Sequence, residues 1–376
     1  MPSLADAPTP SLILDRGKLT RNCAKMLAKC RSLGVMLRPH LKTLKSIDAA
    51  RIAIDPAHGG VAVSTLREAD YFAGHGISDI QYAVCITAGK LLRAKEIAEH
   101  VPGFSFFLDS VEAARAVATA PSPATGPFNV WIEIESGGRR TGVDPSDPAL
   151  IEIAAILRDG GVRLAGVATH GGHSYDARSV EALAEIAEQE RSTVVDAAQR
   201  LRAAGFEVPG VSAGSSPTAT FLAKADGLTE IRPGVYTSGD LFQAGIGVQA
   251  EEDIAVSVLA SVIGRNEARG RVVIDAGGLA LSKDRSTAAL PCDLGYGLVR
   301  DADGEETLGR LIVSGVHQEH GEIDGVSTEA FARLPIGAKV RVLPNHVCMT
   351  AAPYDHYLVV NGGSGIVDRW DKISGW

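Results

Sequence analysis

The stretch V-M-L-R-P-H-L-K-T-L-K, residues 35–45, decides how the first half of the chain is interpreted. A short apolar run is stopped by Pro39 and followed by a basic segment. In one interpretation, a strand ends here and a solvated, basic turn opens the next helix. In the other, Lys42 lies at the C-terminal mouth of a barrel strand, which is where barrel enzymes keep their active sites. The other predicted strands distinguish between these two interpretations.

Short apolar runs recur about every 25 residues across the first 236 residues, with amphipathic helical stretches between them. The longest helical stretch covers residues 177–204. The eight runs are residues 35–40, 60–65, 79–84, 104–109, 128–134, 164–170, 208–214 and 228–236. Nearly continuous apolar strands that alternate with helices are typical of a parallel sheet buried on both faces. Eight such units predict an α/β fold with a (β/α)8 barrel. A doubly wound open sheet is the alternative, although it usually has fewer strands.

The pattern changes after about residue 250. Residues 253–264, 270–277, 339–344 and 357–362 are strand-like, and long helical periodicity disappears. Residues 9–15 are also strand-like and are expected to pair with these strands. We therefore predict a barrel domain over residues 16–245 and a discontinuous β domain made of residues 1–15 and 246–376.

Composition narrows the classes of partner. The 376 residues carry a formal net charge of −8 and no dense basic run, so nucleic acid is not expected as a partner. No apolar run approaches the roughly 20 residues that a membrane span needs, and the first ten residues do not resemble a signal peptide. The five cysteines are scattered, which favours a reducing compartment and a cytoplasmic location.

Several predicted strand ends carry polar residues that could share one site. A lysine amine can form a Schiff base, and a small hydroxyl-rich loop after strand seven can bind phosphate. Together they suit pyridoxal phosphate. The alternative for each is an ordinary solvated turn. The candidates along the chain are Lys42, Arg140, His170, Tyr175, Gly214, Ser215, Ser216, Gly234 and Tyr236.

A second candidate site is L-P-N-H-V-C-M-T, residues 343–350. We expect His346 and Cys348 to lie on one strand, where a spacing of two places both side chains on the same side. Imidazole and thiolate together suit zinc. Two ligands are too few for a closed structural site but fit an open one. The alternative is a histidine at a strand end beside an inert cysteine.

These stretches resemble one family, the fold-type III pyridoxal phosphate enzymes of the D-serine dehydratase and D-threonine aldolase group, which are distant relatives of alanine racemase. Within the group, bacterial D-threo-3-hydroxyaspartate dehydratases are most similar. The resemblance covers nearly the whole chain in the family's order. It rests on residues 9–15, 38–45, 63–69, 131–143, 211–218, 232–236, 274–277, 318–321 and 343–348, and within the group on 284–288 and 293–297.

The resemblance implies a role for each candidate. Lys42 would carry the cofactor as a Schiff base, and Arg140 would lie near the ring's phenolic oxygen. Tyr175 and His170 would lie beside the ring and the substrate. Gly214, Ser215 and Ser216 would hold the phosphate, with help from Gly234 and Tyr236. His346 and Cys348 would bind the metal. In this family the partner subunit covers the barrel mouth, which implies a homodimer.

The family contains more than one reaction. Dehydration of a β-hydroxy-D-amino acid gives a 2-oxo acid and ammonia, whereas retro-aldol cleavage gives glycine and an aldehyde. The aldolases carry H-x-D, which suits manganese or magnesium, whereas H-x-C favours zinc and dehydration. A racemase would leave the metal pair unexplained. A non-catalytic cofactor-binding protein would lack residues 250–376. The sequence leaves open which β-substituent the substrate carries.

Overall fold

The computed structural model describes residues 3–138 and 140–376, which form two compact units. The barrel unit comprises residues 25–42 and 53–234 together with Trp376, and the β unit comprises residues 3–24, 43–52 and 235–375. The helix α1 (Arg16–Leu33) contributes residues to both. The domain boundaries expected from the sequence stay a prediction.

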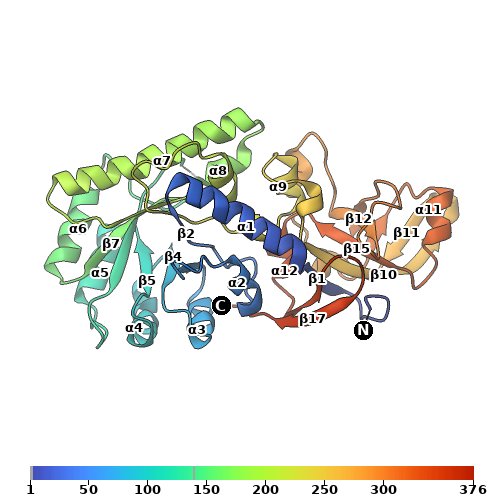
Figure 1. Cartoon of the computed structure of the whole chain (residues 1–376), viewed down its shortest axis with the longest axis horizontal. Helices are drawn as coiled ribbons and strands as arrows, with labels where there is room; N and C mark the ends of the chain where they lie inside the picture. The colour runs from blue at the N-terminus through green and yellow to red at the C-terminus, as the bar shows by residue number, and fades with distance from the viewer. Residues whose placement is uncertain (1–2, 139) are drawn as a thin grey trace. The chain divides into compact units, whose positions relative to one another are not determined.

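The barrel unit contains eight parallel strands, one from each predicted apolar run (Figure 1). They are β2 (Met36–Leu37), β3 (Val61–Val63), β4 (Ile80–Cys85), β5 (Ser105–Leu108), β6 (Asn129–Glu133), β7 (Arg163–Ala168), β8 (Gly210–Ala213) and β9 (Glu230–Ile231). Their order is β2-β9-β8-β7-β6-β5-β4-β3, and a parallel bridge between His40 and Ala62 joins the two edges. The predicted α/β barrel fold is confirmed.

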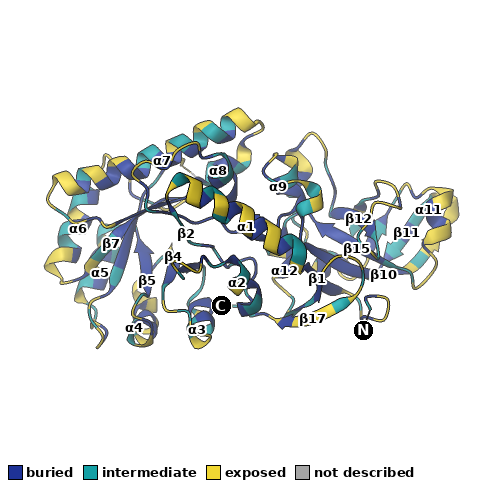
Figure 2. Cartoon of the chain, in the orientation of Figure 1, coloured by how far each residue is buried: buried dark blue, intermediate teal, exposed yellow. Residues whose placement is uncertain are grey.

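Helices connect these strands and cover the outside of the sheet. Figure 2 shows exposed residues on their outward faces, while the strands are mostly buried. The longest, α7, matches the predicted stretch at 177–204 closely, and Ser179 caps its first turn. The helices are α3 (Leu66–Gly74), α4 (Leu91–His100), α5 (Val111–Thr119), α6 (Ala149–Asp159), α7 (Val180–Ala203) and α8 (Ser216–Phe221).

The barrel interior is partly polar, which is unusual for a packed core. Arg38 donates to Glu230 at 2.8 Å and to Asp79 at 2.8 Å, so this largely buried guanidinium lies between two carboxylates. Glu230 also accepts the Ser212 hydroxyl at 2.6 Å, and Arg232 donates to the same hydroxyl. These bonds form a ladder of alternating charges through the barrel that ends at Arg232.

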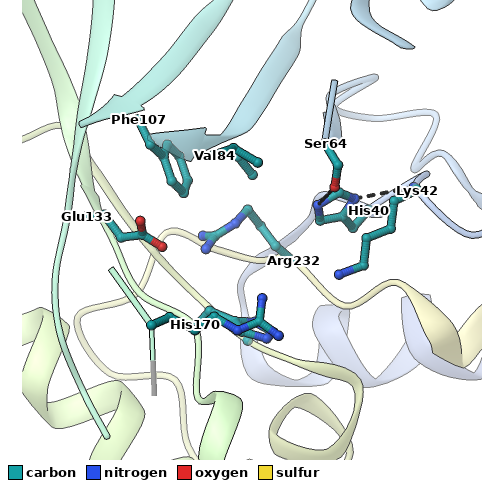
Figure 3. A pocket seen from close by; sticks show the side chains of 11 residues that line it. His40, Lys42, Ser64, Val84, Phe107, Glu133, His170 and Arg232 are labelled. Carbon is teal, nitrogen blue, oxygen red and sulfur yellow. Dashed lines mark hydrogen bonds between the residues drawn. The ribbon is translucent and has the colours of Figure 1, made fainter. Parts of the chain in front are cut away.

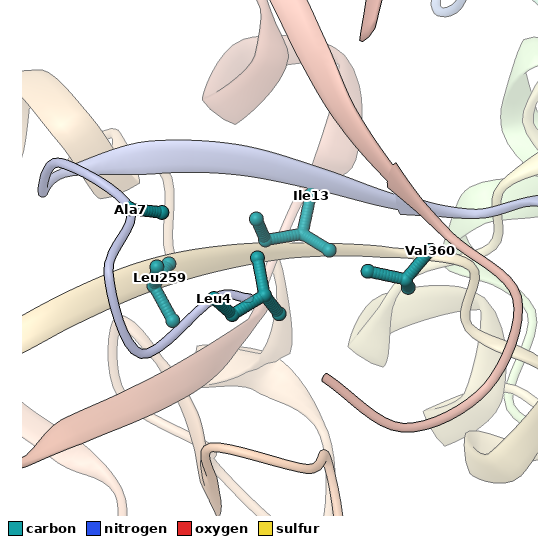
Figure 4. Packing of buried hydrophobic residues seen from close by; sticks show 5 residues of the cluster. All are labelled: Leu4, Ala7, Ile13, Leu259 and Val360. Atoms are coloured by element: carbon teal, nitrogen blue, oxygen red, sulfur yellow. The ribbon is translucent and has the colours of Figure 1, made fainter. Parts of the chain in front are cut away.

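The β unit contains a nine-stranded, mostly antiparallel sheet. Its first strand, β1, pairs with β10 on one side and with β16 on the other, as expected for residues 9–15. Leu4, Ala7, Ile13, Leu259 and Val360 pack together at this junction (Figure 4). The strands are β1 (Ser11–Asp15), β10 (Val256–Asn266), β11 (Arg271–Ile274), β12 (Gly297–Asp301), β13 (Val313–Val316), β14 (Gly321–Ile323), β15 (Lys339–Pro344), β16 (His356–Val360) and β17 (Ile366–Asp371).

The helices of the β unit are short, in agreement with the loss of helical periodicity after residue 250. They are α2 (Ile47–Ala53), whose last residue belongs to the barrel unit, α9 (Leu241–Gly245), α10 (Gly278–Leu281), α11 (Thr328–Arg333) and α12 (Val347–Ala351). Nowhere in residues 3–138 and 140–376 is a helix both long enough and apolar enough to pass through a bilayer.

Candidate active site and metal pair

The C-terminal ends of the barrel strands surround a cavity with about 480 Å³ of space not filled by protein. Four of the predicted site residues line it, namely Lys42, Arg140, His170 and Gly214. In Figure 3 the Lys42 side chain extends into the cavity toward Arg232 and His170. The remaining lining residues are His40, Ser64, Ala83, Val84, Phe107, Glu133 and Arg232. The structure therefore brings the lysine and three of its expected neighbours together.

His40 connects the backbone of Lys42 to the neighbouring strand. Its Nδ1 accepts the backbone N–H of Lys42 at 3.4 Å, so Nε2 carries the proton and faces the Ser64 hydroxyl at 3.4 Å (Figure 3). Gly234 leaves room for this arrangement, because a Cβ there would lie 3.0 Å from the His40 carbonyl oxygen. Gly234 thus supports the strand end that carries Lys42.

The two cavity histidines are held uncharged. Burial lowers the pKa of His170 well below its usual range, and the nearby cations Arg140, Lys42 and Arg232 lower it further. Burial, then Lys42 and Arg232, lower the pKa of His40 in the same way. The Nε2 atom of His170 is buried and has no hydrogen-bond partner within the described residues. Such an atom is expected to meet a ligand or an ordered water molecule.

Arg232 and Glu133 line the cavity but were not predicted as site residues. Arg232 donates to the Thr169 carbonyl at 2.8 Å and lies 5.2 Å from the centre of the Phe107 ring. Glu133 accepts hydrogen bonds from Thr141 at 2.7 Å and from Cys85 at 3.1 Å. The sequence held a signal for Arg232, because Glu230 and Arg232 are charged residues two apart in the predicted strand 228–236, and such a spacing places both on the same side.

The predicted phosphate loop is arranged differently from a simple cradle. The Gly214 amide donates to Glu190 at 3.1 Å, and the Ser215 amide donates to Thr218 at 2.8 Å. Ser215 also caps α8, of which Ser216 is the first residue. Gly214 has a φ of +112°, a conformation that favours glycine. Both amides therefore already have protein acceptors, and the phosphate-binding role of the loop stays a prediction.

The two predicted tyrosines lie in different units. The ring of Tyr175 is 6.4 Å from the ring of His170, measured between centroids, and it belongs to the short helix Gly172–Asp176 of the barrel unit. Tyr236 is buried in the short helix Val235–Thr237, which belongs to the β unit. Tyr175 therefore lies near a predicted catalytic residue of its own unit, and the cofactor-binding roles of both tyrosines stay predictions.

His346 and Cys348 lie close together in the β unit, but not on a strand as expected. The strand β15 ends at Pro344, His346 is the N-cap of α12, and Cys348 lies in its first turn. The prediction of a strand was wrong because proline ends the ladder and the next residues turn into a helix. The two residues still lie within one helical turn of each other, so the pair persists by a different geometry.

The surroundings of His346 are acidic. Its Nδ1 lies 2.6 Å from a carboxylate oxygen of Asp284, and Asp240 accepts the backbone N–H of Val347 at 3.1 Å. Burial opposes the charged form of His346, but the hydrogen bond to Asp284 and the nearby Cys348 outweigh it and raise the pKa of His346 to about 10. An anionic site with one imidazole and one thiol suits a metal cation.

Both implied groups fit the residues that are present. The barrel cavity offers an amine, two guanidinium groups and an orphaned imidazole nitrogen, which suit an anionic aldehyde such as pyridoxal phosphate. The β unit offers a nitrogen and a sulfur donor for a borderline-soft metal such as zinc. No group of three or more His, Cys, Asp or Glu side chains within the described ranges could hold a metal, so the pair would form an open site.

Family models match most of the chain. Residues 14–241 match the alanine racemase N-terminal domain, and residues 255–360 match a putative serine dehydratase domain. The chain is 42% identical to a D-threo-3-hydroxyaspartate dehydratase of Delftia sp. (strain HT23), with 100% of this chain and 99% of that protein covered. The chain belongs to the D-serine dehydratase and D-threonine aldolase family of enzymes.

Other relatives include enzymes named for each of the two reactions of the family. A D-serine dehydratase of Dictyostelium discoideum is 28% identical, with 98% of this chain and 97% of that protein covered. A D-threonine aldolase of Arthrobacter sp. is 29% identical, with 98% and 93% covered. These proteins identify lyases as the enzyme class.

Solved structures agree with the fold over its whole length. The structure of the Delftia dehydratase matches with a TM-score of 0.94 at 40% identity, covering 100% of both chains. A cysteine-to-alanine mutant of a D-threo-3-hydroxyaspartate dehydratase, in the metal-free form, matches with a TM-score of 0.95 at 40% identity over 100% of both chains.

Proposed function

We propose that the protein is a pyridoxal phosphate- and zinc-dependent dehydratase of β-hydroxy-D-amino acids, which releases a 2-oxo acid and ammonia. The observation that carries the proposal is the barrel cavity, where Lys42 shares one space with two arginines and two uncharged histidines. The 42% identity to a D-threo-3-hydroxyaspartate dehydratase supports that amino acid as the first substrate to test, and D-serine as the second.

The cavity residues have distinct tasks in this proposal. Pyridoxal phosphate, when bound, supplies an electron-withdrawing ring that eases removal of the proton on the substrate's Cα. Lys42 would hold the cofactor and would accept that proton with its amine. Arg140 would offset negative charge on the ring oxygen. His170, held uncharged by burial, would contact the ring and the substrate through its unpaired Nε2.

The metal pair supports dehydration over simple proton exchange. Zinc, when bound, supplies Lewis acidity that makes the β-hydroxyl a better leaving group. His346 would hold it through a neutral imidazole nitrogen and Cys348 through a thiolate. The metal-free form of a related cysteine-to-alanine mutant is consistent with a cysteine ligand in that relative. A sulfur ligand favours zinc over the harder manganese and magnesium ions.

The first experiment separates the two lyase reactions. Purified protein with pyridoxal phosphate and zinc is given D-threo-3-hydroxyaspartate, D-serine or D-threonine, and each mixture is assayed for ammonia with 2-oxo acid and for glycine with aldehyde. We expect ammonia together with oxaloacetate or pyruvate. Glycine with acetaldehyde from D-threonine, and no ammonia from the other two, would make the protein an aldolase.

The assembly and location of the protein are also proposals. We propose a homodimer, as the family resemblance implies, which light scattering of the purified holoenzyme would test. A monomer at micromolar concentration would contradict it. We propose a cytoplasmic location because all five cysteines are free thiols.

A further inference from the structure

Each side chain of the proposed metal pair is hydrogen-bonded to a residue far away in the sequence. Asp284 accepts from His346, 62 positions further along the chain, and both side chains are 33% exposed. Asp284 is itself fixed. Its other carboxylate oxygen accepts the Ser286 hydroxyl at 2.7 Å, and its backbone N–H donates to the Ser282 hydroxyl at 3.0 Å. The carboxylate therefore presents one oxygen to the histidine in a defined direction.

The bond to Asp284 determines which nitrogen of His346 can bind a metal. An ionised carboxylate only accepts hydrogen bonds, so the Nδ1 atom of His346 must carry a proton. The lone pair of the neutral ring then lies on Nε2. In the opposite tautomer, the Nδ1 lone pair would face the carboxylate, and Nε2 could not act as a ligand. A carboxylate on the second nitrogen is a common support for metal-binding histidines.

Cys348 has an equivalent partner in Thr43. The hydroxyl oxygen of Thr43 lies 2.9 Å from Sγ of Cys348, and the two residues are 305 positions apart. Thr43 is 2% exposed, and its backbone carbonyl accepts the Tyr357 hydroxyl at 3.4 Å. A sulfur bound to a metal can only accept in this pair, so the Thr43 hydroxyl would donate and fix the direction of the Cys348 side chain.

Asp284 does not act as a third ligand in this arrangement. It contacts the ring nitrogen that points away from the proposed metal position. It also belongs to no cluster of three or more metal-ligating side chains in the part of the chain that the structure describes. Asp284 therefore supports the ligand His346 through Nδ1 and does not bind the metal itself.

We propose that Asp284 and Thr43 are positioning residues of the metal pair: Asp284 holds His346 in the tautomer that leaves Nε2 for the metal, and Thr43 orients the Cys348 sulfur. The inference rests on the proposed metal site. The inference gives a role to two residues, neither of which is proposed to contact the substrate or the metal.

Zinc binding to the intact protein tests the proposal without any assay of activity. Full-length protein is stripped with a chelator and titrated with zinc by calorimetry. We expect D284A to weaken zinc binding about 10- to 100-fold, which is the usual effect of losing such a partner. D284N keeps an acceptor oxygen without the charge and should give a smaller loss. T43V should weaken binding about tenfold, and T43S should restore it, because serine keeps the hydroxyl.

A second carboxylate–histidine pair in the β unit provides the matched control. Asp355 accepts from Nδ1 of His356, and neither residue belongs to the metal pair. D355N should leave the zinc affinity unchanged. Cobalt titration adds an independent readout, because a thiolate–cobalt bond gives a charge-transfer absorption. T43V should weaken this absorption at a fixed cobalt concentration.

The outcomes separate this inference from the proposed function. If wild-type protein binds zinc no more tightly than H346A, the metal site itself is wrong. If wild-type binds zinc through His346 but D284A and T43V bind it within twofold of wild type, the positioning roles are wrong. Circular dichroism of each variant checks the fold, and D284N and T43S decide the question if the larger changes unfold the protein.

Discussion

The barrel cavity and the metal pair place histidines in opposite electrostatic surroundings. His170 is buried among Arg140, Lys42 and Arg232, and its pKa falls well below its usual range. His346 lies beside Asp284, Cys348 and Asp240, and its pKa rises to about 10. The same side chain is therefore an uncharged contact in one unit and a strongly basic group in the other.

This difference shows which sign of ligand each unit can hold. A cavity that already collects cations lowers the energy of an anion, such as the phosphate or carboxylate of a cofactor or substrate. A histidine supported by carboxylates and a thiol lowers the energy of a metal cation. The proposed reaction needs both, because one group must stabilise negative charge at Cα and another must assist the departure of the β-hydroxyl.

Replacing Lys42 should have the largest effect. It should abolish the function of the barrel cavity and leave the metal pair unchanged. We expect K42A to lower the rate of ammonia release by about 10⁴-fold, because it removes both the attachment point of the cofactor and the proposed base. The visible absorption of the protein-bound cofactor should also change. Zinc affinity, measured by calorimetry, should stay as in wild type.

Lys45 provides the control for this change, because it belongs to the same basic segment but does not line the cavity. K45R should retain activity and cofactor absorption. If K42A keeps more than a tenth of the wild-type rate, Lys42 is neither the attachment point nor the base.

Glu230 tests how the ladder of charges inside the barrel stabilises the protein around the cationic cavity. This buried carboxylate contacts Arg38 at 2.8 Å and shares the Ser212 hydroxyl with Arg232. Burial opposes its charge, but Arg38 and Arg232 outweigh burial and keep the pKa of Glu230 low. We expect E230Q to lower the free energy of unfolding by about 3 kcal/mol, because the buried Arg232 and the largely buried Arg38 lose their shared counter-charge. Urea denaturation measures the change.

An exposed carboxylate gives the matched comparison. Glu188 pairs with Arg191 and Lys224, and its side chain is 45% exposed. E188Q should cost less than about 1 kcal/mol, since exposed ion pairs contribute little. Equal losses for E230Q and E188Q would mean that the interior ladder does not carry the stability we assign to it.

The eight barrel strands could be predicted from the sequence because parallel strands covered on both faces must be apolar over nearly their whole length. The β unit was recognised by the loss of helical periodicity, although β12, β13, β14 and β17 were not identified individually. The exception within a predicted strand was His346, where Pro344 ends β15 and the chain turns into α12. The correct pair of residues was found through an incorrect local structure.

The candidate site was predictable only where a residue type carries its own chemistry. Lys42 and Arg140 follow predicted strands, and parallel strands bring their ends together. Asp284 and Thr43 could not be predicted, because an aspartate and a threonine are ordinary surface and turn residues until the fold places them on His346 and Cys348. Arg232 was missed because it lies within the run 228–236, which was interpreted only as a strand.

The last prediction sharpens the comparison through pH. Because His40 and His170 are buried and stay neutral in the folded protein, the unfolded chain binds protons near pH 6.5 that the folded protein does not bind. Stability should therefore fall as pH drops below about 6.5, by up to about 1.4 kcal/mol per pH unit for each histidine. Urea midpoints of the cofactor-free protein between pH 7.5 and 5 would show this slope, and H40N and H170N should each reduce it. A slope that both substitutions leave unchanged would mean that these histidines accept protons in the folded state, and the contrast with the acidic surroundings of His346 would then not reflect a difference in charge.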